Sequence, residues 1–191
     1  NKSLFTIILA AGESKRFGST KQIAIHNGQP LILGSIKLAE KFCGPKNVLV
    51  TGHDWKLINK ISSPLKGFFI INEDFYKGIS SSIRAGVSAV EEVASSILIL
   101  LADQPLISYS HLCNLKQASL ENKKSIIATK YANILGAPAI FPKCSFQELK
   151  NLNGDYGAQK IIRDSLFDII SISFKQAEID IDREKDLDKL N

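Results

Sequence analysis

The chain has 191 residues, of which 45% are hydrophobic and 23% are charged, and its formal net charge is +5. This composition is typical of a globular protein, and the length predicts one domain spanning residues 1–191. No stretch approaches the roughly 18 consecutive apolar residues that a membrane-spanning helix needs. The basic residues are scattered and are not interleaved with aromatic ones, as they often are in nucleic-acid-binding proteins. We therefore expect neither a membrane nor a nucleic acid as a partner.

Cysteine spacing favours a reducing compartment. Cys43, Cys113 and Cys144 are far apart, and no C-x-x-C or Cys/His spacing indicates a zinc site. We expect three buried or half-buried thiols, no cleaved signal peptide and a cytoplasmic protein, because the short apolar run near the N-terminus leads directly into charged residues. The three histidines are isolated in the sequence, and we expect surface or loop positions for them rather than a catalytic base.

Short apolar runs alternate with longer amphipathic stretches along the chain. In chain order, the expected strands are Leu4–Leu9, Asn47–Thr51, Gly67–Ile71, Ser96–Leu101, Ser125–Thr129, Ala139–Phe141 and Ile169–Phe174. The expected helices are Pro30–Phe42, Asp54–Ile61, Ser80–Val93, Ser108–Leu120, Ser145–Asn151 and Tyr156–Ser165, with a final turn or two in Glu184–Leu190. This alternation predicts a three-layer α/β domain with a mostly parallel central sheet.

The most informative segment is the loop after the first expected strand. Residues 9–21 read Leu-Ala-Ala-Gly-Glu-Ser-Lys-Arg-Phe-Gly-Ser-Thr-Lys. Small residues let an anion approach the backbone N–H groups closely, and the cations Arg16 and Lys21 can neutralise it. The spacing of Gly12 and Gly18 fits neither a P-loop nor a Gly-x-Gly-x-x-Gly fingerprint. The segment therefore predicts a polyphosphate cradle of another kind.

Other polar positions fall at the carboxyl ends of the expected strands. Asn72, the Gly78–Ser82 loop and Asp103 each follow a strand, as does the Ala10–Lys21 loop. Ligands of α/β sheets bind beyond the carboxyl ends of the strands. We therefore expect these segments to form one site.

Carboxylates at two places are candidate metal ligands. Asp103 follows the most hydrophobic strand, and such a carboxylate can bind Mg²⁺ together with phosphate oxygens; alternatively, it caps the turn at Gln104–Pro105. Asp180 and Asp182 point to the same face of an extended segment, so they could complete the metal site, or they could form a solvated acidic end of the chain.

The Gly78–Ser82 segment combines a flexible turn with three hydroxyl groups at the start of a helix. Hydroxyl groups there suit hydrogen bonds to a sugar or to the edge of a base. Simple N-capping of the helix explains one of the serines without any ligand.

Several motifs resemble the nucleotidyltransferase family that includes molybdenum cofactor cytidylyltransferase and the related guanylyltransferase. The resemblance covers nearly the whole chain. It is carried by Leu9-Ala10-Ala11-Gly12-x-Ser14-x-Arg16-x-Gly18-x-x-Lys21, Gly28-Gln29-Pro30-Leu31, Gly78–Gly86, Ala102-Asp103-Gln104-Pro105, Gly136-Ala137-Pro138, Gly154-Asp155-x-Gly157-Ala158 and Asp180-Ile181-Asp182.

The resemblance implies a Rossmann-like fold and Mg²⁺-dependent transfer of a cytidylyl group from CTP to a molybdopterin-type cofactor, with Lys21 and Arg16 as catalytic residues. It implies that Ser82 contacts the pyrimidine and that Asp103 binds the metal, with Asp180 and Asp182 as further candidate ligands. The guanylyl branch has Leu-Ala-Gly-Gly where this chain has Ala11, and the added methyl is expected to narrow the base pocket. The expected nucleotide-binding residues are Leu9, Ala10, Ala11, Gly12, Lys21, Asn72, Gly78, Ser82 and Asp103.

Two alternatives remain open at this point. The chain could be a different nucleotidyltransferase, which uses CTP or UTP and has a sugar phosphate or methylerythritol phosphate as acceptor. It could instead be a non-catalytic accessory protein that hands a nucleotide-containing cofactor to a molybdoenzyme. Where the acceptor or the cargo is a molybdopterin-type cofactor, a molybdoenzyme or its chaperone is an expected partner.

Overall fold

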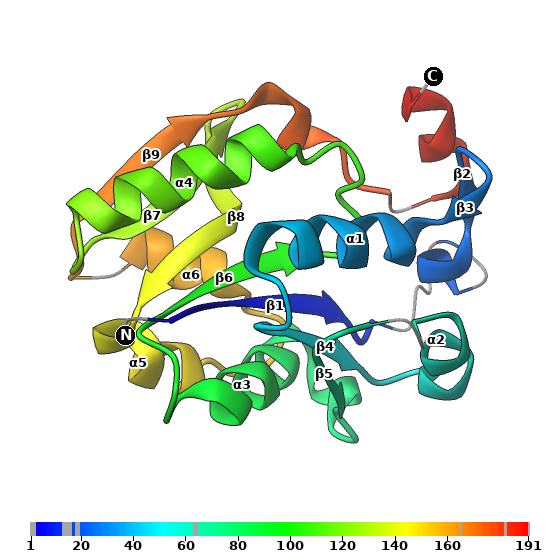
Figure 1. Ribbon diagram of the computed structural model, residues 1–191, viewed down its shortest axis with the longest axis horizontal. Helices are drawn as coiled ribbons and strands as arrows, with labels where there is room; N and C mark the ends of the chain where they lie inside the picture. Colours follow the sequence, from blue (N-terminus) through cyan, green and yellow to red (C-terminus); the bar gives the residue numbers. More distant parts are fainter. Residues whose placement is uncertain are drawn as a thin grey trace.

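The computed structural model describes residues 3–12, 17, 20–62, 65–164, 166–181 and 183–190 (Figure 1). The strands are β1 (Leu4–Ala10), β2 (Ile25–His26), β3 (Gln29–Pro30), β4 (Asn47–Thr51), β5 (Phe68–Ile71), β6 (Ser96–Leu101), β7 (Ile126–Tyr131), β8 (Ile134–Pro142) and β9 (Ile169–Ser173). The α-helices are α1 (Leu31–Cys43), α2 (Trp55–Ser62), α3 (Ile79–Val90), α4 (Tyr109–Glu121), α5 (Phe146–Lys150) and α6 (Ala158–Asp164). The 3₁₀ helices are η1 (Lys21–Ile23), η2 (Phe75–Lys77), η3 (Lys143–Ser145), η4 (Lys175–Glu178) and η5 (Glu184–Leu190).

A seven-stranded sheet forms the middle layer, in the order β5-β4-β1-β6-β8-β7-β9. The pairs β4–β5, β1–β4, β1–β6 and β7–β9 are parallel. Strand β8 runs antiparallel to both of its neighbours, β6 and β7. The structure thus confirms a mostly parallel sheet, with one reversed strand inside it.

Both faces of this sheet are buried, because alternate residues of each central strand enter different cores. Ile7 and Leu9 of β1 pack with Ile83 and Val87 of α3, in a core that α5 and α6 also share. Ile8 packs on the other face in a core that includes residues of α1, α2 and α4. Figure 1 shows α1 and α4 on one side of the sheet and α3 on the other. The expected three-layer architecture is confirmed, and the apolar run Ile97–Leu101 of β6 suits a strand that is covered on both faces.

The largest difference from the expected elements is the length of β8. The sequence predicts a strand over Ala139–Phe141, whereas β8 extends over Ile134–Pro142. Pairing with β7 holds residues 134–136 extended, and β6 pairs only with residues 139–142, so β7 alone accounts for the longer strand although it contains Gly136 and Pro138. The sequence also failed to predict the β2–β3 hairpin. Among the described residues, no helix has both the length and the apolar character needed to cross a bilayer.

The expectation for the histidines is wrong for His111, which is 2% exposed in the core. Its ring stacks on Phe174 with ring centroids 4.3 Å apart. Its Nε2 lies 2.8 Å from Oγ1 of Thr129, and that hydroxyl donates to the carbonyl oxygen of Pro138. The expectation for the cysteines is wrong for Cys144, which is exposed; Cys43 and Cys113 are half-buried as expected.

Candidate functional site

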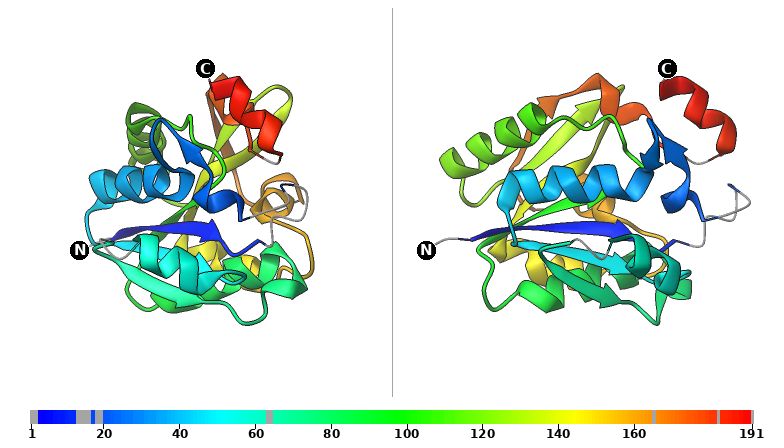
Figure 2. Two further views of the ribbon diagram at one scale, coloured as in Figure 1. Left: turned by 90° about the vertical axis from the view of Figure 1, so that its right-hand side faces the viewer. Right: turned by 45° about the vertical axis from the view of Figure 1, so that its right-hand side comes forward.

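A cleft of about 510 Å³ opens at the carboxyl ends of β1 and β6. Figure 2 turns this end of the sheet toward the viewer in its left panel. The cleft is lined by Leu9, Ala10, Ala11, Gly12, Lys21, Gln22, Leu31, Phe75, Tyr76, Gly78, Ile79, Ser82, Leu101, Ala102, Asp103 and Asp155. The structure therefore brings the loop after β1, the start of α3 and Asp103 together in one site, as the sequence predicted.

Lys21 and Asp103 form an ion pair inside the cleft. The Nζ atom of Lys21 donates to Oδ2 of Asp103 at 2.6 Å, and the two side chains are 15% and 22% exposed. Lys21 is the first residue of η1. Asp103 lies two residues after the end of β6. A cation from one loop and a carboxylate from another are thus held at one point of the cleft wall.

The backbone after β1 is held in place by hydrogen bonds from Gln22 and His53. Nε2 of Gln22 lies 3.3 Å from the carbonyl oxygens of both Ala10 and Gly12. The backbone N–H of His53 donates to the carbonyl oxygen of Ala11 at 3.4 Å. These contacts fix the small residues at the mouth of β1. Arg16 and Gly18, which the sequence predicted as part of this loop, lie outside the described residues.

The far end of the same loop is attached to the turn between β4 and α2. The hydroxyl of Thr20 donates to Oδ2 of Asp54, and Nδ1 of His53 lies 2.7 Å from the same oxygen. The Thr20 hydrogen bond lowers the pKa of Asp54, and His53 lowers it further. Asp54 therefore stays ionised at neutral pH and anchors the segment that leads into Lys21.

The structure also brings the C-terminal segment to Asp103. The backbone N–H of Ile181 donates to the carbonyl oxygen of Asp103 at 3.0 Å. Burial raises the pKa of the Tyr131 hydroxyl, and the charges of Asp180 and Asp103 raise it further. Asp182 lies outside the described residues.

The Asp103 carboxylate itself does not cap the following turn. One oxygen, Oδ2, accepts from Lys21, and the buried Oδ1 has no hydrogen-bond partner in the part of the chain that the structure describes. A buried carboxylate oxygen without a donor is available to a cation. Oxygen donors of this kind are the ligands that Mg²⁺ prefers.

The Gly78–Ser82 segment forms the opposite part of the lining. Gly78 has a φ of +94°, and a Cβ there would collide with the backbone of Gly154. Only glycine allows this close approach, which carries Asp155 to the cleft. No serine side chain caps the helix; the hydroxyl of Ser81 instead lies within hydrogen-bonding distance of the carbonyl oxygens of Gly78 and Asp74.

Asn72 lies behind this lining rather than in it. It is 5% exposed, and its Nδ2 donates to Oγ of Ser81 at 2.8 Å and to Oγ of Ser82 at 3.0 Å. Because Ser82 accepts from Asn72, its own hydroxyl hydrogen can point elsewhere. Asn72 thus positions a hydroxyl group that borders the cleft.

Sequence reasoning did not single out Gln22, Phe75, Tyr76 and Asp155 as site residues. Asp155 belongs to the Gly154-Asp155-x-Gly157-Ala158 motif that carries the family resemblance, and a carboxylate between two glycines is a usable signal of a site residue. Phe75 and Tyr76 lie just before the Gly78–Ser82 segment. Two aromatic residues beside a candidate binding segment are a second usable signal of a site. The carbonyl contacts of Gln22 had no signal in the sequence.

Comparisons with known proteins agree with this architecture. The purine catabolism protein PucB of Bacillus subtilis (strain 168) is 28% identical over 168 residues, which cover 84% of this chain and 80% of PucB. The molybdenum cofactor cytidylyltransferase of Escherichia coli (strain K12) is 29% identical over 178 residues, which cover 92% of this chain and 88% of that protein.

Among solved structures, Rv0371c from Mycobacterium tuberculosis H37Rv is similar over 99% of this chain and 97% of its own, with a TM-score of 0.87 and 22% identity. A second structure of Rv0371c, a complex with manganese, is similar with a TM-score of 0.83 and 21% identity over 99% of this chain and 98% of its own. The sequence profile of the MobA-like NTP transferase domain matches residues 6–169. This chain therefore belongs to the MobA-like NTP transferase family of nucleotidyltransferases, which confirms the family that its motifs predicted.

Proposed function

We propose that this chain transfers the cytidylyl group of CTP to a phosphate of a molybdopterin-type cofactor and releases pyrophosphate, and that residues 1–191 form one domain for this purpose. The observation that carries the proposal is the 2.6 Å ion pair between Lys21 and Asp103 inside the cleft. It joins a cation suited to phosphate oxygens with a carboxylate suited to a divalent metal. The similarity to the E. coli cytidylyltransferase supports the choice of substrates.

In this proposal, the cleft binds the triphosphate along the loop after β1. Ala10, Ala11 and Gly12 carry small side chains or none, so phosphate oxygens can approach the backbone. Lys21 and Arg16 offset the negative charge that develops as a phosphate of the acceptor attacks the α-phosphorus in line. The protein contributes position and charge, and no covalent intermediate with a side chain is needed.

Asp103, Asp180 and Asp182 are the proposed metal ligands. The buried Oδ1 of Asp103 fits this role, and so does the backbone hydrogen bond that holds Ile181 beside Asp103. The described residues contain no group of three or more His, Cys, Asp or Glu side chains that could bind a metal, so a third ligand would come from Asp182 or from the substrate. A bound Mg²⁺ would polarise phosphate oxygens and offset their charge. The manganese complex of Rv0371c supports a divalent metal in this fold.

Ser82 is the proposed contact to the cytosine. Asn72 donates to its oxygen, which leaves the hydroxyl hydrogen of Ser82 free to donate to an acceptor on the base. Ala11 lies in the same lining, and its methyl group narrows the space available to a larger base. One methyl group discriminates by roughly 1–3 kcal/mol, so both residues together would set the base preference.

The decisive experiment is a pyrophosphate-release panel. The four NTPs are tested one at a time, each with and without molybdopterin cofactor, and in parallel with a sugar phosphate and methylerythritol phosphate as acceptors. The proposal expects release only with CTP and the molybdopterin cofactor. Release with another NTP or another acceptor would replace the proposed substrates but keep the reaction class. Tight binding of a nucleotide-containing cofactor with no pyrophosphate under any condition would point to an accessory protein instead.

A further inference from the structure

A second cavity of about 510 Å³ lies at the opposite end of the sheet from the cleft. It is bordered by Leu4 at the start of β1, Ser96 at the start of β6, Ser125 just before β7 and Pro142 at the end of the reversed strand β8. β1 has seven residues, and at about 3.3 Å per residue roughly 20 Å of strand separates the two cavities. The second cavity is therefore a separate site.

This cavity is strongly cationic. Five of the twenty lysines of the chain border it: Lys46, Lys116, Lys123, Lys124 and Lys143. No Asp or Glu occurs among its described lining residues. Within the described ranges, none of these lysines forms an ion pair. Elsewhere in the described residues, Lys77, Lys150 and Lys160 are each paired with a carboxylate, whereas no carboxylate borders this cavity to neutralise its five lysines.

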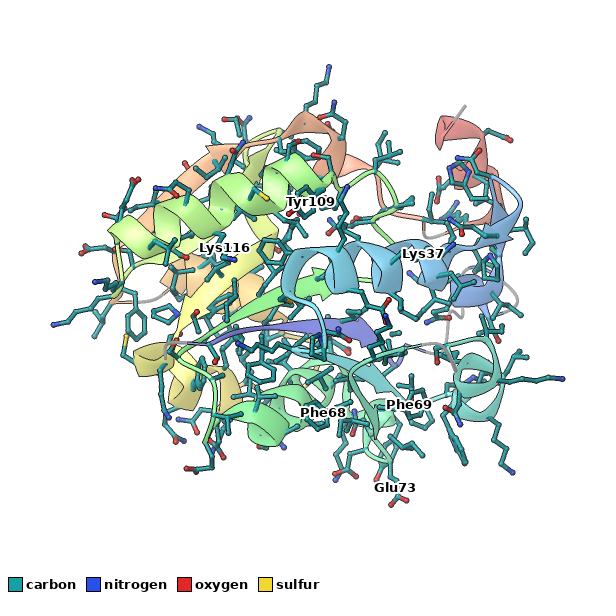
Figure 3. All side chains as sticks on the ribbon, viewed as in Figure 1. Lys37, Phe68, Phe69, Glu73, Tyr109 and Lys116 are labelled. Carbon is teal, nitrogen blue, oxygen red and sulfur yellow. The ribbon has the colours of Figure 1, made fainter. Side chains whose placement is uncertain are left out.

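The lysines come from separate elements and converge on the cavity. Lys116 projects from α4, with its Nζ 5.5 Å from the centre of the Phe42 ring (Figure 3). Lys46 lies in the loop before β4, and its Nζ donates to Oγ of Ser3 at 3.3 Å. Lys143 begins η3 after β8. Several unpaired ammonium groups around one concavity repel one another, and an anion with several charges would relieve that repulsion.

The remaining lining has the character of a small-molecule site. Ser95, Ser119 and Asn122 offer hydroxyl and amide groups, whereas Leu4 and Ile140 provide an apolar wall. Lysine ammonium groups bind phosphate as point charges, and concave sites with one apolar wall suit compact ligands rather than extended surfaces. The volume equals that of the cleft that we propose to bind a nucleoside triphosphate.

We propose that this cavity is a second binding site for a small, multiply charged phosphate compound of nucleotide size. The site is independent of the proposed substrate cleft and does not depend on which reaction that cleft performs. It would allow a phosphorylated metabolite to bind the protein while the cleft is occupied.

Cys144 offers a local readout, since it is exposed and borders the cavity. The rate of its alkylation is measured by mass spectrometry with increasing inorganic tripolyphosphate or ATP. Cys113 is half-buried and not part of the lining, so it serves as the internal reference. We expect saturable protection of Cys144 by both probes, no protection of Cys113, and weaker protection at high salt. The Lys21→Ala variant should retain this protection.

The matched variants are the double substitutions Lys123→Ala/Lys124→Ala and Lys56→Ala/Lys60→Ala. Both remove two positive charges, but the second pair lies on α2, which borders neither cavity. We expect the first to weaken protection by about tenfold or more and the second to leave it unchanged. Equal protection in both variants, or no protection of Cys144 by either probe up to low millimolar concentrations, would overturn the proposal. Protection of Cys144 by an acidic peptide, with no protection by tripolyphosphate or ATP, would also overturn the proposal.

Discussion

Lys21 and Asp103 are 82 positions apart in the sequence, yet the Nζ of one lies 2.6 Å from the Oδ2 of the other. Lys21 enters the cleft from η1, and Asp103 enters it from the carboxyl end of β6. β1 and β6 are hydrogen-bonded neighbours in the sheet, so the loops that follow them meet at one edge. The ion pair fixes the position of the loop after β1 relative to the loop after β6. The proposed function requires both charged groups at this one point of the cleft.

Lys21→Ala should lower the single-turnover rate of pyrophosphate formation by about 100-fold or more, because one well-placed charge next to the reacting phosphate is lost. The measurement is rapid-quench formation of pyrophosphate at saturating CTP. Lys60→Ala removes an exposed lysine on α2 and is the matched control. An unchanged rate in Lys21→Ala would remove this residue from the mechanism.

Asp103→Asn keeps the shape of the side chain but removes the charge that a metal needs. We expect the Mg²⁺ concentration for half-maximal activity to rise by about tenfold or more. Asp168→Asn changes an exposed carboxylate far from the cleft lining and should leave the Mg²⁺ titration unaltered. Wild-type activity should disappear with EDTA and return with added Mg²⁺. The role would be excluded by identical titration curves for Asp103→Asn and the wild type.

Ser82→Ala removes the hydroxyl that Asn72 positions at the cleft. Loss of one neutral hydrogen bond should raise KM for CTP by about 3- to 10-fold, with a smaller effect on kcat, if the bond is made equally in the ground state and the transition state. Ser88→Ala, on the exposed side of α3, is the control. A wild-type KM for CTP in Ser82→Ala would contradict the proposed contact.

Gly78→Ala should destabilise the protein by about 2 kcal/mol or more. Its φ of +94° is strained for alanine, and the new Cβ would collide with backbone atoms of Gly154. Gly34→Ala is the opposite case, since that glycine is helical and, apart from the backbone of its own helix and its chain neighbours, no described atom lies within 4 Å of the new methyl group. It should raise the free energy of unfolding by roughly 0.5–1 kcal/mol. Urea unfolding measures both, and equal effects of the two substitutions would refute the argument.

His111 should make the stability depend on pH. Burial lowers the pKa of His111 from 6.5 to about 4, so between these values the unfolded chain binds a proton that the folded protein does not. The free energy of unfolding should therefore fall as the pH decreases, by about 2 kcal/mol between pH 7 and pH 5 from this residue.

The check is urea unfolding at both pH values for the wild type and for His111→Phe, which can keep the stack on Phe174. The substitution should reduce the pH dependence by that amount. His26→Phe serves as the control, since His26 is only partly buried in the β2–β3 hairpin. If wild type and His111→Phe lost stability equally on acidification, the assignment to His111 would be wrong.

The strands β1, β4 and β6 were predicted to within one residue, and so was the helix α1. The three strands are buried on both faces of the sheet, and the helix is amphipathic on the surface of the sheet. The pattern of hydrophobic residues therefore predicts both kinds of element. β8 was predicted only in part, because its first residues are held extended by pairing with β7 rather than by their own β propensity. The burial of His111 likewise depends on Thr129 and Phe174, which are distant in sequence.

For the site, local sequence was enough to identify the loop after β1, the Gly78–Ser82 segment and Asp103, since each follows an apolar strand and strand ends converge in an α/β sheet. Only the tertiary structure decided that Lys21 pairs with Asp103 and that the Ile181 backbone lies against it. It also decided that Asn72 supports Ser82 from behind and that five lysines surround a second cavity. Distances between side chains on different loops depend on how the whole sheet packs, and no local pattern of residues encodes them.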